Sequence, residues 1–174
     1  MKLTAAQIGY LFVGHCLLAI AINLAINGGI GWLAFEGVDP VPVWGASSSA
    51  GPDLIGTCFF LPLFTCLIVT PIVRRHVRGG RVTPIPAGVR LPFWVRAFRR
   101  RLVPRALSLG LACLAVVGGG LAALLLASGL ETVGNTPFLW WKATFSAGLA
   151  AVVQPAIAVI ALSDPEPAPA AGAA

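Results

Sequence analysis

The chain has 174 residues, of which 57% are hydrophobic types and 10% are charged, and its formal net charge is +6. Soluble domains carry about 25% charged residues, so this chain has too few charges to cover a water-facing surface. The composition therefore argues against a soluble enzyme, a disordered tail and a nucleic-acid-binding domain, and the length fits one domain.

Four stretches without charged side chains are long enough to cross a membrane. A helix needs about 20 apolar residues to cross a hydrocarbon core about 30 Å thick, and every peptide group inside lipid must be bonded within its own segment. The sequence therefore predicts an all-α integral membrane protein. We expect one membrane domain over residues 1–163, with helices at about 7–35, 54–73, 106–130 and 137–162.

The orientation of these helices follows from the distribution of arginine. Segment 74–105 holds ten of the 12 Lys and Arg residues. Short loops rich in Lys and Arg remain in the cytoplasm, so we expect this segment and both termini to be cytoplasmic. The four helices then form two hairpins, each running in-out-in. The small size and the preference for Arg over Lys favour a multi-pass protein of the bacterial inner membrane.

The second and fourth predicted helices share a local pattern. Thr70 precedes Pro71 in one, and Gln154 precedes Pro155 in the other. This pattern indicates either a parallel duplication of the hairpin, which some transporters show, or chance similarity between apolar helices. A proline removes one helical hydrogen bond and bends the helix. Pro71 and Pro155 are therefore either fixed kinks or gating hinges.

Polar side chains inside the first and fourth predicted helices form a candidate site. Asn23 and Asn27 lie one turn apart, and each amide offers both donors and acceptors. We expect them to bond within the helix bundle, either as structural contacts between helices or as a solute or ion site together with His15 and Gln154. An ionisable residue inside a membrane is a functional candidate by default.

Small residues recur at every fourth position in three of the predicted helices. Such residues let helices approach closely in lipid, so we expect the three rows to face one another in a tightly packed bundle. The rows are Ala19-Asn23-Asn27-Gly31, Ala115-Gly119-Ala123-Ala127 and Ala143-Ala147-Ala151-Pro155.

The central basic segment is expected to contain an amphipathic helix in the plane of the membrane. After a proline-rich linker, apolar residues recur at helical spacing from Leu91 to Leu102, and basic residues lie mostly on the other face. The side chains expected to bind anionic lipid headgroups are Trp94, Arg96, Arg99, Arg100 and Arg101. Alternatively, the arginines only set the topology. No nucleic-acid-recognition motif accompanies them, and we expect no nucleic-acid partner.

Two further expectations concern charges beside the fourth predicted helix. Lys142 is expected to extend toward the outer face and to pair with Glu131 or Asp53. Residues 164–174, rich in Pro and Ala, are expected to form a flexible tail.

Residues for catalysis or cofactor binding are scarce. The four cysteines, Cys16, Cys58, Cys66 and Cys113, lack C-x-x-C spacing. The two histidines provide few ligands for haem or zinc. We therefore expect no enzymatic activity, no cofactor and no metal. The first hypothesis is a permease-like protein that moves a small solute or ion as a homodimer. The alternative is a structural or accessory subunit that binds partner membrane helices and anionic lipid without a translocation pathway.

Overall fold

The computed structural model describes residues 3–45, 48–86, 88–99 and 101–164. Within these residues, four helices are long and apolar enough to cross a membrane, and they are called spans one to four here: Ala5–Ala34, Ala50–Arg78, Leu102–Ser128 and Asn135–Leu162. This result confirms the all-helical class and the four membrane-length helices predicted from the sequence.

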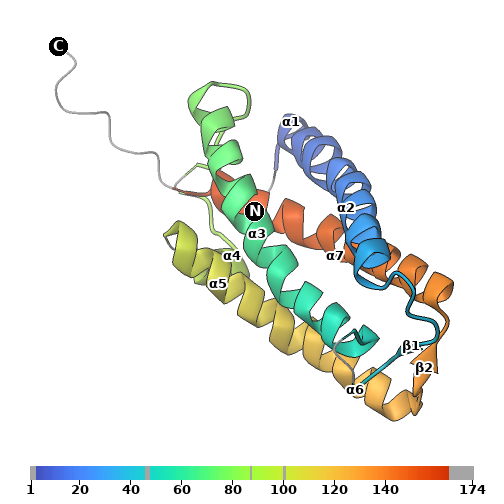
Figure 1. The fold of residues 1–174 in the computed structure, drawn as a ribbon. Coiled ribbons are helices and arrows are strands. Elements are labelled where there is room, and N and C mark those ends of the chain that lie inside the picture. The colour runs from blue at the N-terminus through green and yellow to red at the C-terminus, as the bar shows by residue number, and fades with distance from the viewer. Residues whose placement is uncertain (1–2, 46–47, 87, 100, 165–174) are drawn as a thin grey trace.

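The spans are built from the following elements (Figure 1). Span one comprises α1 (Ala5–Gly9), a π-helical segment η1 (Tyr10–Leu17) and α2 (Leu18–Ala34), and span two is α3 (Ala50–Arg78). Span three comprises α5 (Leu102–Cys113), a second π-helical segment η2 (Leu114–Gly118) and α6 (Gly119–Ser128), and span four is α7 (Asn135–Leu162). The short elements are α4 (Phe93–Ala97), β1 (Val41–Pro42) and β2 (Thr132–Val133).

Spans two and three are longer than the charge-free stretches that predicted them. The last turn of α3 contains Arg75, His76 and Arg78, and α5 begins at Leu102, before Arg105. Arg75 and Arg78 are exposed, and an arginine packs its long aliphatic stem along apolar surface while its guanidinium reaches water. Arg105 is buried instead, and its charge is paired with Asp164. A helix therefore continues through such residues, and charge is a poor marker of where a membrane helix ends.

The four spans pack in the order one, four, two, three. In span one, α2 and η1 pack against α7, whereas α3 packs against α7 on one side and against α5 and η2 on the other. Figure 1 shows α7 running behind α3, with α2 and α5 on opposite sides. Because α2 and α3 both pack on α7, they make few direct contacts with each other.

Small residues mediate the contact between spans one and four. Ala19 and Ala150 are fully buried in one apolar cluster. A Cβ atom added at Gly28 would lie 3.6 Å from the Cβ of Ala143. The expected close approach of these two helices is therefore found.

The expected row in span three is wrong, because Ala115, Gly119, Ala123 and Ala127 are exposed. The face that packs on α3 instead contains Gly110, where an added Cβ would lie 3.0 Å from the Phe59 ring. Alanine and glycine are so common in this helix that several faces carry a four-residue repeat. The π-helical segment η2 also interrupts the row, because its wider turn shifts the following residues around the axis.

One end of the molecule, here called the strand end, is formed by the chain after α2 and after α6. There β1 and β2 pair antiparallel, with Val41 opposite Val133. The Val43 N–H donates to the Glu131 carbonyl at 2.8 Å. The Asn135 side chain donates to the carbonyls of Phe35 and Val38 at 2.8 and 2.9 Å. These bonds join the two connecting segments, which the sequence analysis treated as separate loops.

The opposite end, here called the arginine end, contains the segment between spans two and three. Val82, Ile85 and Val95 of this segment are buried against the ends of α3 and α7. The Ile85 N–H donates to the Leu162 carbonyl at 2.8 Å. Among the described residues between 91 and 102, the helix of this segment is limited to Phe93–Ala97, so the expected amphipathic helix is reduced to α4. Like charges at Arg96 and Arg99, three positions apart, oppose its continuation.

Candidate intramembrane polar site

The structure brings together two of the predicted site residues, His15 and Gln154. His15 lies in η1 and is buried, and Gln154 lies in α7. The Gln154 amide donates to His15 Nδ1 at 3.4 Å, a long hydrogen bond. The π-helical turn that carries His15 is notable, because such segments occur frequently at functional sites.

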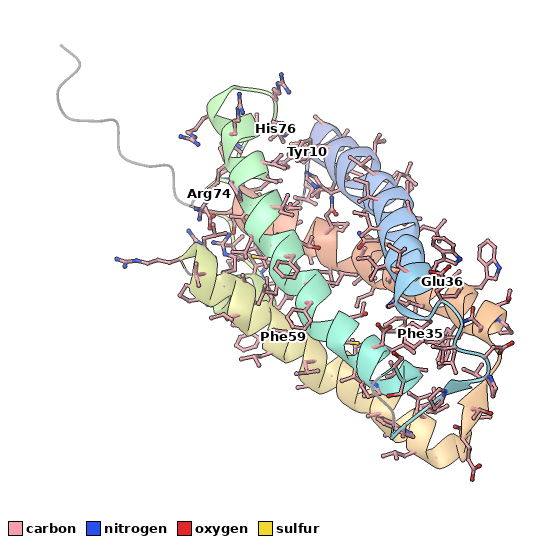
Figure 2. The ribbon with its side chains drawn as sticks, viewed as in Figure 1. Tyr10, Phe35, Glu36, Phe59, Arg74 and His76 are labelled. Atoms are coloured by element: carbon pink, nitrogen blue, oxygen red, sulfur yellow. The ribbon has the colours of Figure 1, made fainter. Side chains whose placement is uncertain are left out.

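Tyr10 and His76 extend this polar group to the arginine end. The Tyr10 hydroxyl lies 2.9 Å from His76 Nδ1, and the Tyr10 and His15 rings meet edge-on with centroids 4.8 Å apart. Figure 2 shows Tyr10 and His76 pointing toward each other from span one and α3. The sequence analysis missed Tyr10, and it assigned His76 to a loop although the residue belongs to α3.

Asn23 and Asn27 form hydrogen bonds within their own helix. The Asn23 amide donates to the Ala19 carbonyl at 3.0 Å, and the Asn27 amide donates to Asn23 Oδ1 at 3.2 Å. Both side chains are half-buried. The expected bonds to other helices are therefore not observed for these amides within the described residues, and the structure does not place them in contact with His15 or Gln154.

The two amides nevertheless lie on the face of span one that packs on α7. Every fourth residue from His15 through Ala19, Asn23, Asn27 and Gly31 is buried or half-buried. Between them lie apolar side chains that are 39–53% exposed: Ile22, Leu24, Ile26 and Ile30. We call this series of buried and half-buried residues, at positions 15, 19, 23, 27 and 31, the polar row. At 1.5 Å per residue it extends about 24 Å along the helix, most of the thickness of a hydrocarbon core.

A buried ion pair lies beside the far end of the polar row. Lys142 Nζ donates to the two carboxylate oxygens of Asp53 at 2.5 and 2.6 Å, which confirms Asp53 rather than Glu131 as its partner. The Lys142 side chain is 3% exposed, so it does not extend to the surface as expected. A Cβ added at Gly31 would lie 3.0 Å from Lys142 Cδ. The glycine thus provides the space through which the lysine passes.

Asp53 is also placed to hold a negative charge. It lies in the first turn of α3, where the helix dipole favours an anion. The Lys142 ammonium lies 5.8 Å from the centroid of the Phe35 ring, near the end of span one. Charge and aromatic surface from spans one, two and four therefore meet at this point.

A second cluster of buried charge at the arginine end was not anticipated. Asp164 accepts hydrogen bonds from Arg74 at 2.7 and 2.9 Å and from both terminal nitrogens of Arg105. Arg105 is 1% exposed, whereas Arg74 is 40% exposed. Asp164 thus belongs to the packed domain and not to a flexible tail, and Arg105 is buried and not part of a loop. The rest of the predicted tail, 165–174, lies outside the described residues.

The remaining predicted residues lie apart from the polar row. Pro71 is exposed in α3 and Pro155 is half-buried in α7, and both helices continue through them, so a hinge role stays a prediction. Trp94 and Arg96 are exposed on α4, Arg99 follows this helix and Arg101 precedes α5. Arg100 lies outside the described residues.

The part of the chain that the structure describes contains no group of three or more His, Cys, Asp or Glu residues that could hold a metal ion. The four cysteines are free thiols, and Cys58 and Cys66 are fully buried.

Comparisons of the chain with protein-family models, curated proteins and solved structures find no match. The class of the protein therefore rests on its own fold, which has four membrane-length helices, and the candidate site rests on the polar row and the groups at its ends.

Proposed function

We propose that the chain is a non-enzymatic, permease-like membrane protein that moves a small solute or ion along the polar row of span one. The observation that carries this proposal is the position of Asn23 and Asn27. They are half-buried on the face toward α7, between the His15–Gln154 contact at one end and the Lys142–Asp53 pair at the other. A polar series of this length inside apolar helices costs free energy, and such residues commonly mark solute pathways.

The two amides supply the chemistry that a small polar solute needs. Asn23 donates one N–H and accepts one hydrogen bond, and Asn27 donates one N–H. Each amide has two donor hydrogens and an oxygen with two lone pairs. The unused capacity suits a neutral solute with hydroxyl or amide groups, or a cation that exchanges water for amide oxygens.

We also propose the orientation and assembly in which this pathway works. The excess of arginine in segment 74–105 favours a cytoplasmic arginine end, with both termini cytoplasmic and two in-out-in hairpins in a bacterial inner membrane. Span one packs mainly on α7, which leaves its open side toward lipid. A second copy placed against span one would cover this side, and we propose a homodimer as the transporting unit.

Flux measurements on reconstituted protein test the proposal. Purified protein in lipid vesicles is assayed with radiolabelled monovalent cations and a panel of small polyols and amides. We expect wild-type protein to move at least one of these above the rate of empty vesicles. Asn27→Leu should reduce that flux about tenfold, the effect of losing one hydrogen bond of about 1.4 kcal/mol.

The matched control is Ile26→Leu, which changes an exposed apolar neighbour without changing its polarity. This variant should transport at the wild-type rate. Helical circular dichroism verifies that each variant is folded. Full flux in Asn27→Leu, or no flux by wild type across the panel, would refute the pathway.

The structural or accessory subunit remains the second candidate, and one observation favours it. Both amides already have a bonding partner within their own helix, so they do not need a solute. A subunit of this kind would show no flux, and Asn27→Leu would weaken its co-purification with a partner membrane protein. The flux assay therefore separates the two candidates.

A further inference from the structure

A pocket of about 500 Å³ lies at the arginine end, in the segment between spans two and three. It is lined by Val89, Arg90, Leu91, Arg96 and Arg99. Arg96 lies in α4, and Arg99 lies just after this helix, where its N–H donates to the Arg96 carbonyl at 3.3 Å. Arg90 reaches the pocket from the linker that precedes Pro92.

The three arginines bring uncompensated positive charge to this pocket. Within the residues that the structure describes, the ion pairs are formed by Arg74, Arg105 and Lys142 with Asp164 and Asp53, and the three pocket arginines take part in none of them. A guanidinium presents planar N–H donors that match the oxygens of a phosphate in pairs. The pocket therefore has the positive charge and the N–H donors that a phosphate group needs.

The pocket is also anchored to the core of the protein. Val89, Leu91 and Phe98 pack against the apolar cluster formed by α3, α7 and the linker. The Phe98 carbonyl, one residue before Arg99, accepts a hydrogen bond from Arg105 Nε at 3.1 Å. A site whose supporting residues are already held in place loses less entropy when it binds a ligand.

We infer that this pocket binds a phosphate group. The expected source is the headgroup of an anionic phospholipid, because the aromatic side chains beside the pocket face outward. Phe93 is 78% exposed and Trp94 is 41% exposed, and tryptophan is enriched at the level of lipid headgroups. Free inorganic phosphate has the same recognition chemistry and is the other source to be tested. This binding site does not depend on the proposed transport.

The inferred site differs from the one expected from the sequence. Arg90 lines the pocket although the periodicity of the basic segment did not include it. Trp94 and Arg101 were expected to bind headgroups but do not line the pocket. The site is therefore an open pocket lined by three arginines and not the charged face of a long amphipathic helix.

Binding measurements on the full chain in a neutral detergent test the inference. The probes are short-chain phosphatidylglycerol, short-chain phosphatidylcholine and inorganic phosphate, with affinity read by thermophoresis. The pocket variants are Arg90→Gln, Arg96→Gln and Arg99→Gln. Arg75→Gln and Arg81→Gln are the controls, because these arginines are exposed at the same end but do not line the pocket.

We expect each pocket variant to weaken phosphatidylglycerol binding about tenfold, the loss of roughly one charge-assisted hydrogen bond. The two controls should bind within about twofold of wild type, because Arg75 and Arg81 do not line the pocket. Binding of inorganic phosphate with the same dependence on the variants, but without preference for the lipid, would support the site and identify free phosphate as its source. Equal losses in pocket and control variants, or no loss in any, would overturn the inference.

Discussion

Removing the carboxylate of Asp164 should destabilise the protein more than any other single change at the arginine end. Asp164→Asn takes the charged partner from Arg105, which is 1% exposed, and from Arg74, which is 40% exposed. Arg74 can turn to water, but the Arg105 guanidinium cannot do so without displacing the apolar residues around it. The cost of this variant is therefore set by Arg105.

The magnitude follows from the burial of the two partners. Breaking a buried ion pair costs about 3–5 kcal/mol. The Asp164 side chain is 11% exposed, and Arg105 keeps its bond to the Phe98 carbonyl, so the lower limit applies. We expect Asp164→Asn to lower the free energy of unfolding by about 3 kcal/mol, roughly a 150-fold change in the unfolding equilibrium.

Reversible unfolding in mixed micelles measures this loss, with helical circular dichroism as the signal. Arg74→Gln is the matched variant, because it removes the exposed partner of the same carboxylate and should cost less than about 1 kcal/mol. The double variant Asp164→Asn with Arg105→Met should regain part of the lost stability, since it also removes the buried charge. If Asp164→Asn were no more destabilising than Arg74→Gln, the reasoning from burial would be wrong.

Two further predictions concern the strand-end half of the molecule and use the same unfolding assay. Asp53→Asn should lower the free energy of unfolding by about 3 kcal/mol, because it leaves a lysine that is 3% exposed without its carboxylate. Lys142→Met should lower it less, because the carboxylate that it leaves is 23% exposed. Equal losses in the two variants would contradict this reasoning. Gly31→Ala should lower the free energy of unfolding by about 1–2 kcal/mol, because the added Cβ would lie close to the Lys142 side chain. Gly29→Ala should lower it by nothing, because no atom lies within 4 Å of a Cβ at that position. A reversed order of the two variants would refute the packing argument.

Membrane spans are readable from sequence because lipid imposes a strong constraint on length and charge. The four spans were predicted on that basis, and Asp53 was one of the two partners expected for Lys142. The ends of the spans were harder to predict, because arginine occurs both inside helices and at the membrane interface. Arg75 therefore lies inside a helix that was predicted to end at residue 73, and Arg105 lies inside a helix that was predicted to begin at residue 106.

The polar contacts between spans were harder to anticipate. Arg105 and Asp164 are 59 positions apart in sequence, and they come together because α5 and α7 both pack on α3. The sequence did contain a signal for this ion pair, since Arg105 and Asp164 both border long apolar runs at the same predicted face of the membrane. The tyrosine at position 10 gave no comparable signal, because its partner His76 was placed in a loop. The exposed alanine row of span three shows that small residues alone do not define a contact face.

The hydrogen bonds at the strand end have a consequence for how span one moves. The carbonyls that follow α2 are bound by Asn135, and the chain beyond them pairs through β1 with β2. At its other end, span one is held by side-chain bonds from Gln7 to the Thr83 carbonyl and between Tyr10 and His76. Span one is thus held by more hydrogen bonds at the strand end than at the arginine end. We expect it to pivot about the β1–β2 junction, so that any widening beside Asn23 begins from the His76 side.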